Sequence, residues 1–111
     1  MRIDSRSVRG VTVLVPNGNM TIGVGDVALR RAIGQALEAG SHNIVINLGG
    51  TQLMDSSGIG EMLTGHRTVS NRGGKLKLAN IPSGIRDLLQ PTQVLATFEV
   101  FDDEIDAVNS F

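Results

Sequence analysis

The chain has 111 residues and carries 10 basic against 11 acidic side chains, for a formal net charge of −1 at pH 7. A balance so close to neutral argues against a nucleic-acid partner, because binding to phosphates normally requires a basic patch. Three Phe and no Tyr or Trp provide no platform for stacked bases. The absence of Cys excludes disulfides and a thiolate nucleophile, and the length predicts one domain over residues 1–111.

Targeting and membrane segments are not predicted either. No apolar run approaches the roughly 20 residues that cross a bilayer. Residues 1–10 lack the apolar centre of a signal peptide. We therefore expect a cytoplasmic protein without membrane insertion, in keeping with the lack of Cys.

The first element in chain order is a β-hairpin. A short strand is expected to turn at Arg9-Gly10 into a second, Val-rich strand over residues 11–15. Pro16 cannot donate to a β-ladder, so the second strand is predicted to end there or to lie at a sheet edge there. The hairpin thus predicts an antiparallel start to the sheet.

A helix and a buried strand are predicted next. Residues 26–40 place apolar side chains at helical spacing, with Asp26 as the expected N-cap and Gly40 as the C-terminal stop. Residues 43–50, "NIVINLGG", form a continuous apolar run that predicts a strand buried on both faces.

The second half of the chain continues the alternation of helix and strand. A second helix is expected to open with Ser56, Ser57 and Gly58 and to end at Gly73-Gly74. Its inner face is expected to consist of Ile59, Met62, Leu63 and Val69. The remaining expectations are a half-buried strand over 75–80 with both lysines outward, a short helix over 82–90 with Pro82 near its first turn, a strand over 96–101 and a helix over 102–111. The order predicts an α/β fold: a mixed sheet with an antiparallel N-terminal hairpin, then parallel strands, and about four helices.

The stretch most informative about function is "GGTQLMDSSGIGEML", residues 49–63. Asp55, Ser56 and Ser57 stand where the second helix begins, and free amides at such a position favour an anion. One of the three is expected to cap the helix, but none has a Glu or Gln three residues later to complete a capping box. Gly58 and Gly60 are expected to lower the relief around the serines for close approach by another protein. Leu53-Met54 is expected to dip back toward the core. Capping and function both stay open from the residues alone.

"VINLGGTQLMDSSGIGEML", residues 45–63, resembles the signature of the STAS domain family in its anti-sigma factor antagonist branch. The order of elements and the Gly-Gly-Lys-Leu turn at 73–76 are similar over nearly the whole chain. The resemblance implies a STAS-type fold and a binding protein that is not an enzyme. It implies that Ser56, directly after the aspartate, is phosphorylated by a partner that is both anti-sigma factor and serine kinase.

The same resemblance implies the working cycle and the contact surface. The unmodified form would bind the anti-sigma factor and free a sigma factor, phosphorylation would break the complex, and a serine phosphatase would reset it. ATP and magnesium would belong to the kinase, and no cofactor is expected in this chain. The expected contact residues are Asp55, Ser57, Gly58, Ile59, Met62, Gly18, Asn19 and Thr21, of which Ile59 and Met62 could instead be core.

One departure from the family pattern concerns the loop expected after the second strand. It reads Gly18-Asn19-Met20-Thr21, without the charged residues that the family often shows, so partner choice could differ. A STAS module that is never phosphorylated, acting as a scaffold or associated with a transporter or stress complex, is the alternative from another class.

Enzymatic and metal sites find less support. The residue two before Ser56 is Met54, so only half of a Gly-x-Ser-x-Gly hydrolase motif is present. "GVGD", residues 23–26, lacks the third glycine of a nucleotide fingerprint, and Gly74-Lys75 is not followed by Ser or Thr as a P-loop requires. His66 is expected as a satisfied side chain, partly buried or at the surface, about 15 Å along the helix from Ser56, and His42 as a solvated loop residue. The acidic run over 102–106 is expected as a solvated helix start.

Overall fold

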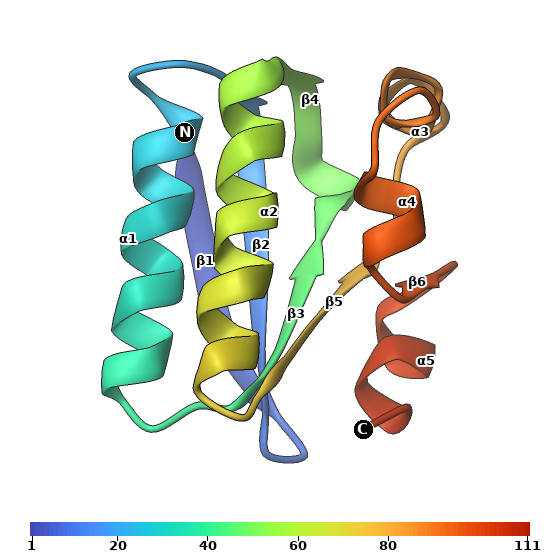
Figure 1. The fold of residues 1–111 in the computed structure, drawn as a ribbon. Coiled ribbons are helices and arrows are strands. Elements are labelled where there is room, and N and C mark those ends of the chain that lie inside the picture. The colour runs from blue at the N-terminus through green and yellow to red at the C-terminus, as the bar shows by residue number, and fades with distance from the viewer.

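The computed structural model describes all 111 residues as a mixed sheet with helices packed against it (Figure 1). The strands are β1 (Arg2–Val8), β2 (Val11–Met20), β3 (Asn43–Asn47), β4 (Thr51–Met54), β5 (Lys75–Ala79) and β6 (Val100–Phe101). The helices are α1 (Gly25–Glu38), the 3-10 turn η1 (Leu48–Gly50), α2 (Ser56–Asn71), α3 (Ser83–Leu89), α4 (Val94–Thr97) and α5 (Glu104–Asn109). The sheet order is β1-β2-β3-β5-β6, with β4 paired to β2.

The predicted fold class is confirmed. β1 and β2 form an antiparallel hairpin, and every later pairing in the sheet is parallel. Five α-helices are present where about four were expected, because α4 was missed. No helix is both long and apolar enough to span a membrane.

Strand β2 is longer than predicted and does not end at Pro16. It pairs with β3 through residues 12–14 and with β4 through residues 18–20, while β1 covers its other edge. Pro16 falls in the interval between the two parallel ladders, where a missing N–H breaks neither. The change of partner therefore accommodates the proline inside the sheet, which the expectation of an end or an edge did not foresee.

The start of α1 also differs from the prediction. The N-cap position is Val24, which provides no side-chain hydrogen bond, and Asp26 lies in the first turn of the helix. There the Asp26 carboxylate accepts a hydrogen bond from the Val27 amide at 2.7 Å. The predicted stop at Gly40 is confirmed, because Gly40 adopts φ +89° directly after the C-cap Ala39.

Two separate cores lie on the two faces of the sheet. Helices α1 and α2 lie side by side across one face (Figure 1), over the larger core that includes Leu14, Ile44, Ile46 and Leu78. The strand residues that alternate with these, Val13, Val45 and Ala79, join Val11 and the α5 residues Ala107 and Val108 in a smaller core. Because side chains alternate across a sheet, α5 covers the opposite face from α1 and α2.

The prediction that both β5 lysines point outward into solvent is wrong for Lys77. It does alternate with the inward leucines, but it lies on the face that α5 covers and is only 3% exposed. Its ammonium donates to the carbonyl and hydroxyl of Ser110 at 3.1 and 2.9 Å, pairs with Glu99 at 3.2 Å and lies 4.3 Å from the Phe111 ring centroid. Lys75 is exposed, as predicted.

The predicted strand over 96–101 was too long. Residues 94–97 form the short helix α4, and only Val100 and Phe101 pair with β5. Phe98, between them, is buried in the larger core. Residues 96–99 therefore do not form the strand that their alternation suggested. The Phe98 ring packs into the larger core instead.

Candidate functional site

The aspartate of the Asp-Ser-Ser motif caps α2. Asp55 Oδ1 accepts from the amides of Ser57 at 2.9 Å and Gly58 at 3.2 Å, and Oδ2 accepts from the amide of Ile22 at 3.0 Å. These bonds lower the pKa of Asp55 below its usual range, with the Ile22 amide contributing most. Asp55 is therefore a carboxylate at neutral pH, and it fastens the chain after β2 to the start of α2.

Ser56 stands at the first position of α2 and is exposed. Ser57, one residue later, is half-buried. The two hydroxyls of the motif are thus not equivalent, because Ser56 is the more accessible to a second protein.

The end of β2 and the start of α2 lie next to each other. Gly18, Asn19 and Met20 belong to β2 and pair with β4, so the loop predicted for residues 18–21 is mostly strand. The Asp55 amide donates to the Met20 carbonyl at 3.3 Å. The structure therefore brings together two segments, ending at Thr21 and beginning at Asp55, that are more than 30 residues apart in the chain.

Gly58 was predicted to lower the surface relief around the serines, but it is buried. It permits close packing of α2 against Met20 instead. A Cβ on Gly58 would lie 2.4 Å from the Met20 carbonyl oxygen and 2.5 Å from Met20 Cγ. Gly60, in contrast, is exposed with nothing within 4 Å of where its Cβ would be. Only Gly60 matches the expected bare surface.

Met62 is wrong as a contact residue. Its side chain is completely buried in the larger core, which is the alternative that the periodicity of α2 had allowed. Ile59 is half-buried and packs against the same core, so only part of it is accessible.

Three exposed apolar side chains near the motif were not predicted as site residues. Ile22 is 72% exposed, Val24 is 50% exposed and Leu53 is 59% exposed. Ile22 is bonded to Asp55 through its amide, and Leu53 precedes Asp55 by two residues in β4. The expectation that Leu53-Met54 dips into the core holds for Met54 but not for Leu53, because residues 51–54 form a strand that pairs with β2.

The two histidines lie away from this site. His42 is exposed in the turn before β3. The His66 ring packs edge-on against Phe98 with 5.0 Å between ring centroids, and its Nδ1 is buried without a hydrogen-bond partner, so the expectation of a satisfied side chain is wrong.

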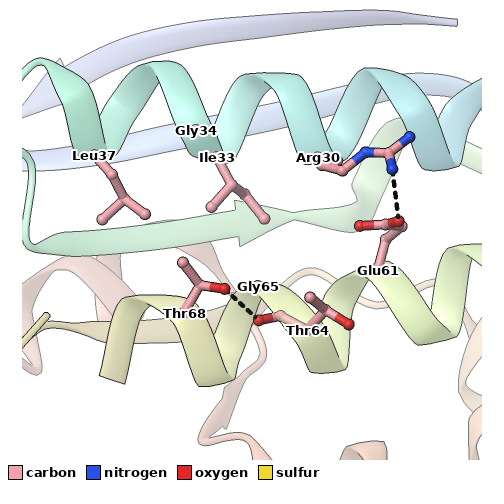
Figure 2. A pocket seen from close by; sticks show the side chains of 8 residues that line it. All are labelled: Arg30, Ile33, Gly34, Leu37, Glu61, Thr64, Gly65 and Thr68. Carbon is pink, nitrogen blue, oxygen red and sulfur yellow. Dashed lines mark hydrogen bonds and ion pairs between the residues drawn. The ribbon is translucent and has the colours of Figure 1, made fainter. Parts of the chain in front are cut away.

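A groove lies between α1 and α2 and is lined by residues of both helices (Figure 2). At one end, the Arg30 guanidinium lies 3.9 Å from the Glu61 carboxylate, and along α2 the Thr68 hydroxyl donates to the Thr64 carbonyl at 3.0 Å. A Cβ on Gly65 would lie 2.5 Å from Ile33 Cδ1, so this glycine allows the helices to approach. The groove contains no nucleophile paired with a base, and we treat it as a packing feature.

Known proteins share this arrangement. The STAS domain model matches residues 2–107. The chain is 24% identical over 109 residues to an anti-sigma F factor antagonist of Paenibacillus polymyxa, covering 97% of this chain and 92% of the relative. Among solved structures it is similar to the phosphorylated form of the Bacillus cell fate determinant SpoIIAA, with a TM-score of 0.75, 22% identity and 98% of each chain covered.

The fold is shared beyond antagonists. A sulfate transporter family protein from Wolinella succinogenes superposes with a TM-score of 0.79 at 18% identity, covering 93% of this chain and 85% of that one. Because the family model spans nearly every residue, from β1 into α5, the chain belongs to the STAS domain family.

Proposed function

We propose that this protein is an anti-sigma factor antagonist that works as a phosphorylation-controlled binding switch, with Ser56 as the acceptor. The observation that carries the proposal is an exposed serine at the first position of α2, directly after a capping carboxylate. The similarity to an anti-sigma F factor antagonist supports it. The similarity to a structure described as a phosphorylated form supports it further.

The geometry suggests how the switch would act. A phosphoryl group adds about −1.5 to −2 charges at neutral pH. The amides of Ser57 and Gly58 already donate to Asp55. A phosphate on Ser56 would therefore stand beside the Asp55 carboxylate and face the partner. Two neighbouring anions would repel an acidic group and would be costly to bury against an apolar one.

The proposed partner is an anti-sigma factor with serine kinase activity, which supplies ATP and magnesium, and a serine phosphatase would reverse the modification. The contact surface would include Ser57, Ile59 and Gly18-Asn19 together with Thr21. In support, the Asp55 amide donates to the carbonyl of Met20, the residue between Asn19 and Thr21. The exposed Ile22 would add an apolar contact. Since Met62 is buried, we leave it out of this surface.

Mapping of phosphate by mass spectrometry tests the acceptor. The protein is incubated with an anti-sigma factor kinase of its own organism, ATP and magnesium. We expect one phosphate on Ser56, none in a Ser56→Ala variant, and normal labelling in the matched Ser57→Ala variant. Phosphate on Ser57 instead, or labelling that survives Ser56→Ala, would contradict the assignment. A wild-type chain that no kinase labels would favour the unphosphorylated scaffold.

A further inference from the structure

Helix α5 is tied to the sheet by a charged network on the face opposite α1 and α2. The Arg6 guanidinium donates to both carboxylate oxygens of Glu104, at 2.6 Å each, and the Glu104 side chain is only 14% exposed. The Asn47 amide nitrogen donates to Glu104 Oε1 at 3.0 Å. The Arg6 bonds, chiefly, and the Asn47 bond hold the pKa of Glu104 below its usual range. The expectation of a solvated acidic run is therefore wrong for this residue.

The side-chain oxygen of Asn47 binds the segment that leads to Ser56. It is the last residue of β3 and the N-cap of η1, and its Oδ1 accepts from the Gly49 amide at 2.9 Å. The turn η1 redirects the chain into β4, and β4 ends one residue before Asp55. Both polar atoms of one side chain thus join α5 to the turn before the site.

The segment after Asn47 has few other polar anchors, although Leu48 and Met54 are buried in the larger core. Gly49 and Gly50 have no side chains, and β4 is four residues long, with an irregular register against β2 between Gly18 and Asn19. The Thr51 hydroxyl makes only a long bond, 3.4 Å, to the Pro16 carbonyl. Among polar contacts, the cap that Asn47 places on the η1 turn therefore contributes most to the direction in which β4 starts.

We propose that Glu104 and Asn47 are positioning residues, and that the Arg6–Glu104–Asn47 relay sets the η1 turn and, through β4, the place of Ser56. Docking of α5 on one face of the sheet would then help to hold Ser56 in place at the end of the sheet where β4 stops. The last step of this inference rests on the proposed function, whereas the coupling of α5 to η1 and β4 does not.

Amide hydrogen exchange tests the coupling between α5 and the η1 turn. The test first removes the hydrogen bond from Asn47 to Glu104 and then restores it with donor and acceptor exchanged. In Asn47→Asp, the new carboxylate still accepts from Gly49 but repels Glu104. We expect exchange to rise about tenfold over residues 48–55 and over α5, because a hydrogen bond to a charged group is lost and local opening becomes easier. Exchange in α1 should stay unchanged.

The rescue variant separates positioning from general damage. Adding Glu104→Gln to Asn47→Asp restores the hydrogen bond between positions 47 and 104 with donor and acceptor exchanged, but it removes one of the two acceptors of Arg6. Exchange over residues 48–55 should therefore fall most of the way back toward wild type. Asp106→Asn, an exposed change on the same helix, should alter nothing. The proposal fails if residues 48–55 stay protected in Asn47→Asp, if α1 opens equally, or if the double variant is not rescued.

A second readout connects the relay to the site. Once a kinase labels Ser56, Asn47→Asp should slow labelling at subsaturating kinase, and the double variant should restore the rate. Labelling that proceeds at the wild-type rate in Asn47→Asp, despite raised exchange, would end the claim that the relay positions Ser56. If no kinase labels the wild type, the proposed function fails while the exchange result stands by itself.

Discussion

Replacing Ser56 with aspartate is expected to weaken binding to the anti-sigma factor by about 100-fold, or about 2.7 kcal/mol, without loss of thermal stability. The new carboxylate would stand beside Asp55, whose lowered pKa keeps it charged, and two neighbouring anions would repel an acidic group of the partner and disfavour an apolar one. An acidic side chain at the start of a helix is itself favourable, so the fold should be retained. Isothermal titration measures the affinity, and calorimetric melting measures the stability.

Thr64→Asp provides the matched control for this substitution. It adds the same charge at an exposed position of α2, about 12 Å further along the helix axis. We expect its affinity to stay within about threefold of wild type. Equal loss of binding in both variants would indicate a general charge effect, and wild-type affinity of Ser56→Asp would remove the electrostatic basis of the switch.

Gly58→Ala is expected to lower the free energy of unfolding by about 2 to 3 kcal/mol, the upper part of the range for overpacking. The added methyl would collide with the Met20 carbonyl oxygen, which is backbone and cannot rotate away as a side chain can. The Met20 carbonyl also accepts the Asp55 amide, so the clash would separate the end of β2 from the start of α2. Chemical denaturation measures the loss.

Gly60→Ala, two residues further along the same helix, should have the opposite sign. Nothing lies within 4 Å of its added Cβ, and alanine is favoured over glycine inside a helix by about 0.5 to 1 kcal/mol. Both substitutions raise helix propensity, so helix propensity cannot explain a difference in stability between the two variants. If Gly58→Ala were as stable as Gly60→Ala, the packing described between α2 and β2 would be incorrect.

Local patterns predicted most of the fold because they act over short distances. The hairpin turn at Arg9-Gly10, the buried run of β3 and the periodicity of α2 all appear in the structure. The errors arose where a segment distant in the chain determines whether a side chain is buried. Lys77 alternates as expected, yet α5 covers the face on which it lies.

The site was predicted in part for the same reason. The Asp-Ser-Ser-Gly motif could locate the start of a helix and a candidate acceptor, since capping is local. It could not indicate that β4 pairs with β2, which leaves Leu53 exposed and places Ile22 against Asp55. Nor could helical spacing distinguish a contact residue from a core residue at Met62, because burial depends on what packs against that face.

The most direct test of the central claim compares one protein in two states. Wild-type chain phosphorylated on Ser56, with occupancy verified by mass, is titrated into the anti-sigma factor before and after treatment with a serine phosphatase. We predict at least 100-fold weaker binding in the phosphorylated state, full recovery after the phosphatase, and the same melting temperature within about 2 °C. Equal affinities in the two states would contradict the account.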